Sequence, residues 1–163
     1  MEECKWTVLY VEDNQLNMAL VHHIFKRNLP SVLLLKAETA ELGLQMARDA
    51  QPNLIILDIG LPGLNGYEAL EILQQDQATC HIPVLATSAF AQSSDIEQAR
   101  KKGFAEYITK PFQVKAFTET VKKAALRRRP AEDLARNSNR GFIKVGNWGD
   151  LCLAAGSRAA VIR

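Results

Sequence analysis

Five polar side chains of this 163-residue chain each lie at or just after the end of a short apolar run. They are Glu12, Asp13, Asp58, Ser88 and Lys110. Carboxylates about 4 Å apart repel each other by roughly 4 kcal/mol at an effective dielectric constant near 20, so a cluster of three requires a cation. Oxygen ligands with room for water suit Mg²⁺, which often shares its coordination with phosphate oxygens. The set therefore suits phosphoryl transfer, with Asp58 as nucleophile, Ser88 as hydrogen-bond donor and Lys110 as the charge that steadies a phosphoryl oxygen.

These side chains can meet only if the apolar runs form neighbouring strands of one sheet. Residues 54–57 are four consecutive aliphatic residues, which is typical of a strand buried on both faces in a parallel sheet covered by helices. The expected strands cover residues 6–11, 32–35, 54–58, 82–87 and 107–109. The expected helices cover residues 15–28 and 39–50, start after Asn65, run over 94–102, and start again near Val114.

Five strands that alternate with five helices predict an α/β fold with right-handed crossovers. We expect a flavodoxin-like, doubly wound (βα)5 arrangement, in which a parallel five-stranded sheet has the order 2-1-3-4-5. In that order the strands that carry the five polar residues are neighbours. Ligands of such sheets bind at the carboxyl ends of the strands, so we expect the pocket there.

Helix faces and caps follow from apolar spacing and capping residues. Asn65 with Glu68, and Ser94 with Glu97, predict capping boxes, and Gly103 predicts a helix end. The apolar residues taken to mark the helix faces are Leu16, Leu20, Ile24 and Phe25, then Leu42, Met46 and Ala50, then Leu70, Ile72 and Leu73, and finally Val114, Phe117, Val121 and Ala125.

Charge divides the chain into two parts with different compositions. Residues 1–121 carry ten Lys and Arg against fifteen Asp and Glu, whereas residues 122–163 carry ten against three. We expect one domain over residues 1–129 and a basic tail over 130–163 that is poorly ordered or derives from cloning or a frame shift. No run is long enough for a bilayer and residues 1–5 lack the layout of a secretory signal, so we expect a cytoplasmic protein without membrane contact.

Four segments together make the chain resemble the receiver domain of two-component response regulators. They are Val11-Glu12-Asp13-Asn14, the stretch from Leu57 to Gly66, Ala86-Thr87-Ser88-Ala89, and Ile108-Thr109-Lys110-Pro111-Phe112. Each segment is short, but the combination is specific and spans roughly Lys5 to Ala125. Gly60 and Leu61 depart from the side chains that many members of this family carry there.

The resemblance implies a role for each matched residue. Asp58 would accept phosphate from a phosphohistidine, and Lys110 would bind the phosphoryl group, with a cis bond before Pro111. Ser88 and Tyr107 would form the switch. The implied ligands of Mg²⁺ (or Mn²⁺) are Glu12, Asp13, Asp58 and the backbone carbonyl of Gly60.

The resemblance also implies partners: a sensor histidine kinase or a histidine phosphotransfer protein, and a downstream protein that binds the helix 4, strand 5 and helix 5 face. No output domain is visible, which favours a single-domain response regulator, but a receiver excised from a hybrid histidine kinase would have the same residues. We expect a monomer or a phosphorylation-dependent dimer, and no chemistry beyond its own phosphorylation and dephosphorylation.

Three other functions fit less well. A phospho-aspartyl phosphatase would need an acid two residues after the nucleophile, where this chain has Gly60. A serine hydrolase is disfavoured because Ser88 lacks a Gly-x-Ser-x-Gly elbow and because His22, His23 and His81 are badly placed to serve it. The basic tail could touch nucleic acid, yet no reader module fits into it, so we expect no specific nucleic-acid binding.

Overall fold

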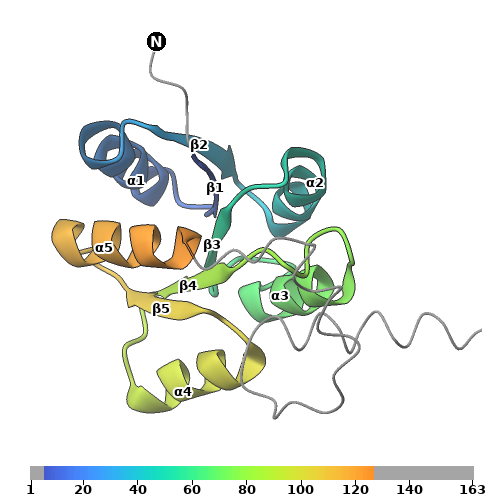
Figure 1. The fold of residues 1–163 in the computed structure, drawn as a ribbon. Coiled ribbons are helices and arrows are strands. Elements are labelled where there is room, and N and C mark those ends of the chain that lie inside the picture. Colours follow the sequence, from blue (N-terminus) through green and yellow to red (C-terminus); the bar gives the residue numbers. More distant parts are fainter. Residues whose placement is uncertain (1–5, 127–163) are drawn as a thin grey trace, which may run out of the picture.

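The computed structural model describes residues 6–126, in which five strands and five helices alternate along the chain (Figure 1). The strands are β1 (Trp6–Val11), β2 (Val32–Ala37), β3 (Leu54–Asp58), β4 (Val84–Ser88) and β5 (Glu106–Thr109). The helices are α1 (Gln15–Asn28), α2 (Ala40–Ala50), α3 (Gly66–Gln75), α4 (Ser93–Lys102) and α5 (Val114–Ala125). The predicted basic tail, residues 130–163, lies outside the described residues.

All strand pairs in the described sheet are parallel, and their order is β2-β1-β3-β4-β5. This confirms the flavodoxin-like α/β fold predicted from the apolar runs. Of the three inner strands, β3 and β4 are buried along their whole length, as expected of a sheet with helices on both faces. Because the strands are parallel, the carboxyl ends of β1, β3, β4 and β5 meet at one edge of the sheet.

Two hydrophobic clusters fill the space on either side of the sheet. Helices α1 and α5 pack against one face with Val8 and Tyr10 of β1, and α2, α3 and α4 pack against the other with Leu9 and Val11 (Figure 1). Alternate residues of β1 therefore serve opposite cores. By the same alternation, residues 8, 10 and 12 lie on the α1 and α5 side.

The predicted apolar faces of four helices were partly wrong. In α1 the buried residues are Met18, Val21, Ile24 and Phe25, whereas Leu16 is 81% exposed and Leu20 is 43% exposed. In α2 the buried residues are Ala40, Gly43 and Ala47, whereas the predicted Leu42 and Ala50 are exposed. The predicted Met46 is partly buried and packs against the core. Ile72 of α3 and Val114 of α5 are likewise exposed.

Close packing explains the difference in α2. A Cβ atom on Gly43 would lie 2.7 Å from Cγ2 of Val11, so this helix sits too close to β1 for a large side chain. Small residues therefore face the sheet, and the larger Leu42 is turned toward solvent.

The helix boundaries bear out one predicted capping box and contradict the other. Asn65 and Glu68 form the expected capping box at the start of α3, and Gly103 ends α4 with a φ of 108°. Helix α4 instead begins at Ser93, with Gln92 in the capping position and no side-chain cap bond. Backbone N–H groups of Asp95 and Ile96 donate to the Gln92 carbonyl, so Ser94 already lies within the first turn.

Among the described residues, no helix combines the length and apolar character needed to cross a bilayer.

Candidate functional site

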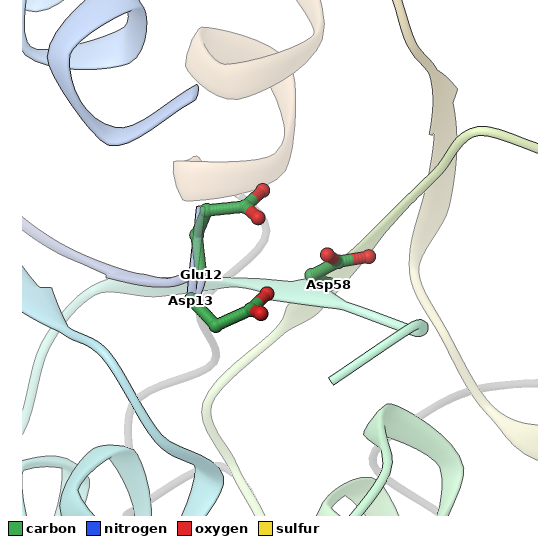
Figure 2. Close-up of side chains that lie close together, drawn as sticks. All are labelled: Glu12, Asp13 and Asp58. Atoms are coloured by element: carbon green, nitrogen blue, oxygen red, sulfur yellow. The ribbon is translucent and has the colours of Figure 1, made fainter. Parts of the chain in front are cut away.

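Three carboxylates meet at the carboxyl edge of the sheet, where β1 and β3 lie side by side. Ligand oxygens of Glu12, Asp13 and Asp58 all lie within 4.8 Å of one another. Figure 2 shows Glu12 and Asp13 diverging from the end of β1, with Asp58 beside them on the next strand. Glu12 is 1% exposed and Asp58 is 7% exposed, whereas Asp13 is open to solvent.

This donor set fits Mg²⁺ or Mn²⁺. Carboxylate oxygens are hard ligands, and the exposed side of Asp13 leaves room for the waters or phosphate oxygens that Mg²⁺ keeps in its coordination shell. Three carboxylates against one ammonium also leave an excess of negative charge at a largely buried position. The arrangement is therefore one that a divalent cation would stabilise.

Lys110 supplies the ammonium group of the cluster. Its Nζ atom lies 2.6 Å from Oε2 of Glu12 and 3.0 Å from Oδ2 of Asp58, and its side chain is largely buried. The Lys110 backbone N–H donates a hydrogen bond to the carbonyl of Ser88, which joins the segment that follows β5 to the end of β4. The peptide bond before Pro111 is cis, as predicted. The structure thus brings Lys110 to Asp58 from 52 residues away in the sequence.

Burial and hydrogen bonds divide the charge unevenly between the two buried carboxylates. Burial acts to raise the pKa of Glu12, but hydrogen bonds from Lys110 and Tyr10 outweigh it and lower that pKa below its ordinary value. Burial raises the pKa of Asp58, although the Gly60 N–H and Lys110 favour its charged form. Burial acts to lower the pKa of Lys110, yet its bonds to Glu12 and Asp58 raise it. Of the two buried carboxylates, Glu12 is therefore the one whose charged form is stabilised, and Asp58 is the one whose charged form is disfavoured.

The loop after β3 fixes the orientation of Asp58. The Gly60 N–H donates to Oδ1 of Asp58 at 3.0 Å, which leaves Oδ2 toward Lys110. Gly66 packs against the same loop, since its N–H donates to the Ile59 carbonyl and an added Cβ would lie 2.6 Å from the Asp58 carbonyl oxygen. The role of the Gly60 carbonyl as a metal ligand stays a prediction.

Ser88 and Tyr107 both hold the backbone of Phe90. Oγ of Ser88 accepts a hydrogen bond from the Phe90 N–H at 3.0 Å, and the Tyr107 hydroxyl donates to the Phe90 carbonyl at 2.8 Å. Ser88 is buried at the end of β4, whereas Phe90 is 70% exposed. The two predicted switch residues are thus linked through the residue between them.

Two residues near the pocket were not predicted to take part. Tyr10 is fully buried and donates its hydroxyl to Oε2 of Glu12 at 2.8 Å. The signal was its position two residues before Glu12, which places both side chains on the same face of β1. Thr87 pairs with Asp58 in the strand register, and its buried hydroxyl has no hydrogen-bond partner within residues 6–126.

The histidines do not complete a hydrolase triad. His22 and His23 are exposed on α1, and His81 precedes β4 at the amino edge of the sheet, opposite the pocket. Ser88 instead accepts from a backbone N–H. This geometry gives no support to Ser88 as an activated nucleophile.

Comparisons with known proteins point in one direction. The model of the response regulator receiver domain matches residues 8–122. The polar-differentiation response regulator DivK of Brucella ovis is 38% identical over 116 residues, which cover 71% of this chain and 93% of that protein.

Solved structures agree with this match. The signal receiver domain of a putative Luxo repressor protein from Vibrio parahaemolyticus has a TM-score of 0.70 at 25% identity and covers 80% of this chain and 96% of its own. The receiver domain of the Francisella response regulator 1452 has a TM-score of 0.69 at 22% identity and covers 77% of this chain and 100% of its own.

Proposed function

Because this chain belongs to the response regulator receiver domain family, we propose that it accepts a phosphoryl group from a phosphohistidine onto Asp58. The observation that carries the proposal is the contact of Lys110 with both Asp58 and Glu12 beside Asp13. This contact supports the proposal because it joins a carboxylate that could act as nucleophile, an ammonium group and carboxylates that could hold a metal. These are the parts that phosphoryl transfer requires of a protein.

Asp58 is the nucleophile in this proposal. Its Oδ atom forms a bond to phosphorus as the phosphorus–nitrogen bond of the phosphohistidine breaks, and the electron pair of that bond leaves with the imidazole. The Gly60 N–H holds Oδ1 of Asp58 and so presents Oδ2 toward the site of transfer. The product is an acyl phosphate on Asp58.

Glu12, Asp13 and Asp58, with the backbone carbonyl of Gly60, would hold Mg²⁺ or Mn²⁺. When bound, such an ion offsets the negative charge of the phosphoryl oxygens. Lys110 moves its ammonium group from the two carboxylates to a phosphoryl oxygen, which removes the charge repulsion that would otherwise oppose a phosphate among carboxylates. The chain's own residues therefore orient the acceptor and balance the charge.

The switch follows from the contacts of Phe90. A dianionic phosphoryl group offers strong acceptor oxygens near Ser88, and the Ser88 hydroxyl would turn to donate to one of them. That movement loosens the bond from the Phe90 N–H and displaces the carbonyl that holds the Tyr107 hydroxyl. Release of Tyr107 would then change the face formed by α4, β5 and α5, to which a downstream protein binds.

The partners follow from the reaction. A phosphohistidine donor is carried by a sensor histidine kinase or by a histidine phosphotransfer protein, and cytoplasm is the compartment in which we place the exchange. Similarity to DivK, which is itself a response regulator, favours a single-domain regulator that acts by protein contacts. A receiver belonging to a hybrid histidine kinase is the second candidate. In both cases the chain is a phosphoryl acceptor and has no turnover on outside substrates, since Gly60 provides no acid.

Intact mass spectrometry after incubation with acetyl phosphate and Mg²⁺ tests the proposal. We expect one phosphoryl adduct on the native chain and none on Asp58→Asn. Asp49→Asn, an exposed aspartate on α2, is the matched control and should keep the adduct. An adduct that survives in Asp58→Asn, or no adduct with any donor, would refute the assignment, and many turnovers of a phosphomonoester would favour a phosphatase instead.

A further inference from the structure

One carboxylate oxygen of Glu12 accepts two hydrogen bonds. Its Oε2 atom accepts the Tyr10 hydroxyl at 2.8 Å and the Lys110 ammonium at 2.6 Å. Within residues 6–126, Oε1 accepts one hydrogen bond, from the Asn14 N–H at 3.2 Å. Both bonds favour the charged form of Glu12, and Oε2 keeps one donor if the other leaves, which gives the resting protein a redundancy at this atom.

This redundancy has a use if one donor leaves. In the function proposed above, Lys110 transfers its ammonium group from the carboxylates to the phosphoryl oxygens. Glu12 is 1% exposed with Lys110 in place, so Oε2 has no contact with bulk solvent in the resting structure. A buried carboxylate oxygen without a donor is strongly unfavourable, and that penalty would oppose the movement of Lys110.

Tyr10 is built to stay in place during this movement. Its ring is fully buried in the cluster formed with α1 and α5, in the row where β1 pairs with Ile56 of β3. The hydroxyl reaches Glu12 from two residues earlier on the same strand face. Lys110 has a flexible side chain and bonds both Glu12 and Asp58, whereas Tyr10 has a rigid ring and bonds Glu12.

We propose that Tyr10 is a positioning residue that keeps Glu12 hydrogen-bonded when Lys110 moves to the phosphoryl group, and so stabilises the phosphorylated state. This inference rests on the proposed function of Asp58. A core tyrosine that merely finds Glu12 as a convenient acceptor would affect stability alone. The two roles differ in which state of the pocket they stabilise.

Tyr10→Phe separates these roles, because it removes the hydroxyl and keeps the ring. The assay is beryllofluoride, which mimics a phosphoryl group on Asp58, titrated with saturating Mg²⁺ and followed by ¹⁹F NMR. We expect beryllofluoride to bind Tyr10→Phe about tenfold more weakly than the native chain, the scale of one hydrogen bond to a charged group. Mg²⁺ alone should bind within about twofold of the native affinity, because Lys110 still holds Glu12 in the resting state.

Tyr67→Phe removes a phenol hydroxyl from the other face of the sheet, where the ring of Tyr67 packs against Phe104, and should change neither affinity. Unchanged beryllofluoride affinity in Tyr10→Phe, or an equal loss for Mg²⁺ and beryllofluoride, would overturn the role of Tyr10. If beryllofluoride fails to bind the native chain, or binds Asp58→Asn as well, the proposed function fails instead.

A measurement on the native chain covers the case in which Tyr10→Phe does not fold. With ¹³Cζ-labelled tyrosine, the Tyr10 resonance should shift when beryllofluoride binds, since its hydroxyl becomes the sole donor to Oε2 of Glu12. The reference is the chain with saturating Mg²⁺ alone, because Glu12 is itself one of the proposed Mg²⁺ ligands. A Tyr10 resonance that does not shift from this reference at saturating beryllofluoride would contradict the proposal.

Discussion

Asp58→Asn should stabilise the metal-free protein, even though it abolishes the proposed chemistry. At an effective dielectric constant of about 20, Glu12 and Asp13 within 4.8 Å each repel Asp58 by roughly 3.5 kcal/mol. At the same dielectric constant Lys110 at 3.0 Å attracts it by about 5.5 kcal/mol. Solvent weakens the repulsion from the exposed Asp13, whereas burial of Asp58 adds a further cost to its charged form. We therefore expect neutralisation to raise the free energy of unfolding by about 1–2 kcal/mol.

The pH dependence follows from the raised pKa of Asp58. Because burial raises this pKa above its ordinary value of 3.8, the folded state holds the proton more tightly than the unfolded state. Below pH 3.8 the carboxyl is protonated in both states, and the native chain suffers no penalty from this residue. The penalty develops as pH rises from 3.8 through the pKa of the folded state, and it is complete above that value.

Urea denaturation in EDTA, followed by far-UV circular dichroism from pH 3 to pH 8, measures both effects. The advantage of Asp58→Asn should be present at neutral pH and shrink toward acid. Saturating Mg²⁺ should reduce the difference in stability between the variant and the native chain, since a cation bound by the native carboxylates stabilises the native chain more than the variant. A variant that is less stable than the native chain in EDTA would refute this account of the pocket's electrostatics.

Two further substitutions probe the neighbours of Asp58. Gly66→Ala should destabilise the protein by about 2 kcal/mol or more and slow phosphorylation, since its Cβ would lie 2.6 Å from the Asp58 carbonyl oxygen and force the loop to move. Its control, Gly63→Ala, meets no atom within 4 Å and should cost only about 1 kcal/mol for its φ of 73°; equal losses in the two variants would contradict the packing argument. Thr87→Val should stabilise by about 1 kcal/mol, because it replaces a buried hydroxyl without a described partner by a methyl group of similar size, and phosphorylation should stay within about twofold. Urea midpoints and adduct formation measure these changes, and a destabilised Thr87→Val would mean that the hydroxyl has a partner.

The sheet could be predicted from the sequence because its strands leave a strong signal. Continuous aliphatic runs such as Leu54 to Leu57 indicate strands buried on both faces, and alternation with helices then fixes a parallel sheet. Parallel strands bring their carboxyl ends to one edge, so the neighbourhood of Asp58 and Lys110 follows from topology alone. The hydrogen bond of Lys110 to Asp58 agrees with that expectation.

The helix faces were less predictable because the decisive quantity is distance to the sheet. Gly43 carries no hydrophobic signal, yet it lies in the centre of the buried side of α2 because Val11 leaves no room for a side chain. The exposed Leu16 shows the converse case, a large apolar residue that a spacing rule assigns to the interior. Ser94 failed as a cap since the backbone of Gln92 had already closed the first turn.

The site was missed where a residue of the core also serves the pocket. Tyr10 belongs to an apolar run, so the sequence pattern assigns it to the first strand and gives no separate signal for its hydroxyl. Only the alternation of β1 could have shown that it lies on the same face as Glu12. Strand residues two positions before a functional carboxylate are thus worth inspection whenever they carry a polar atom.

Ser88 and Tyr107 both contact Phe90 through its backbone. The Phe90 N–H donates to Ser88 Oγ, and the Phe90 carbonyl accepts from the Tyr107 hydroxyl. The ring of Phe90 takes no part in either bond and projects into solvent. In the proposed switch, the side chain at position 90 could therefore vary, and with it the preferred partner, while both hydrogen bonds to the backbone are kept. Proline is the exception, because it has no N–H to give.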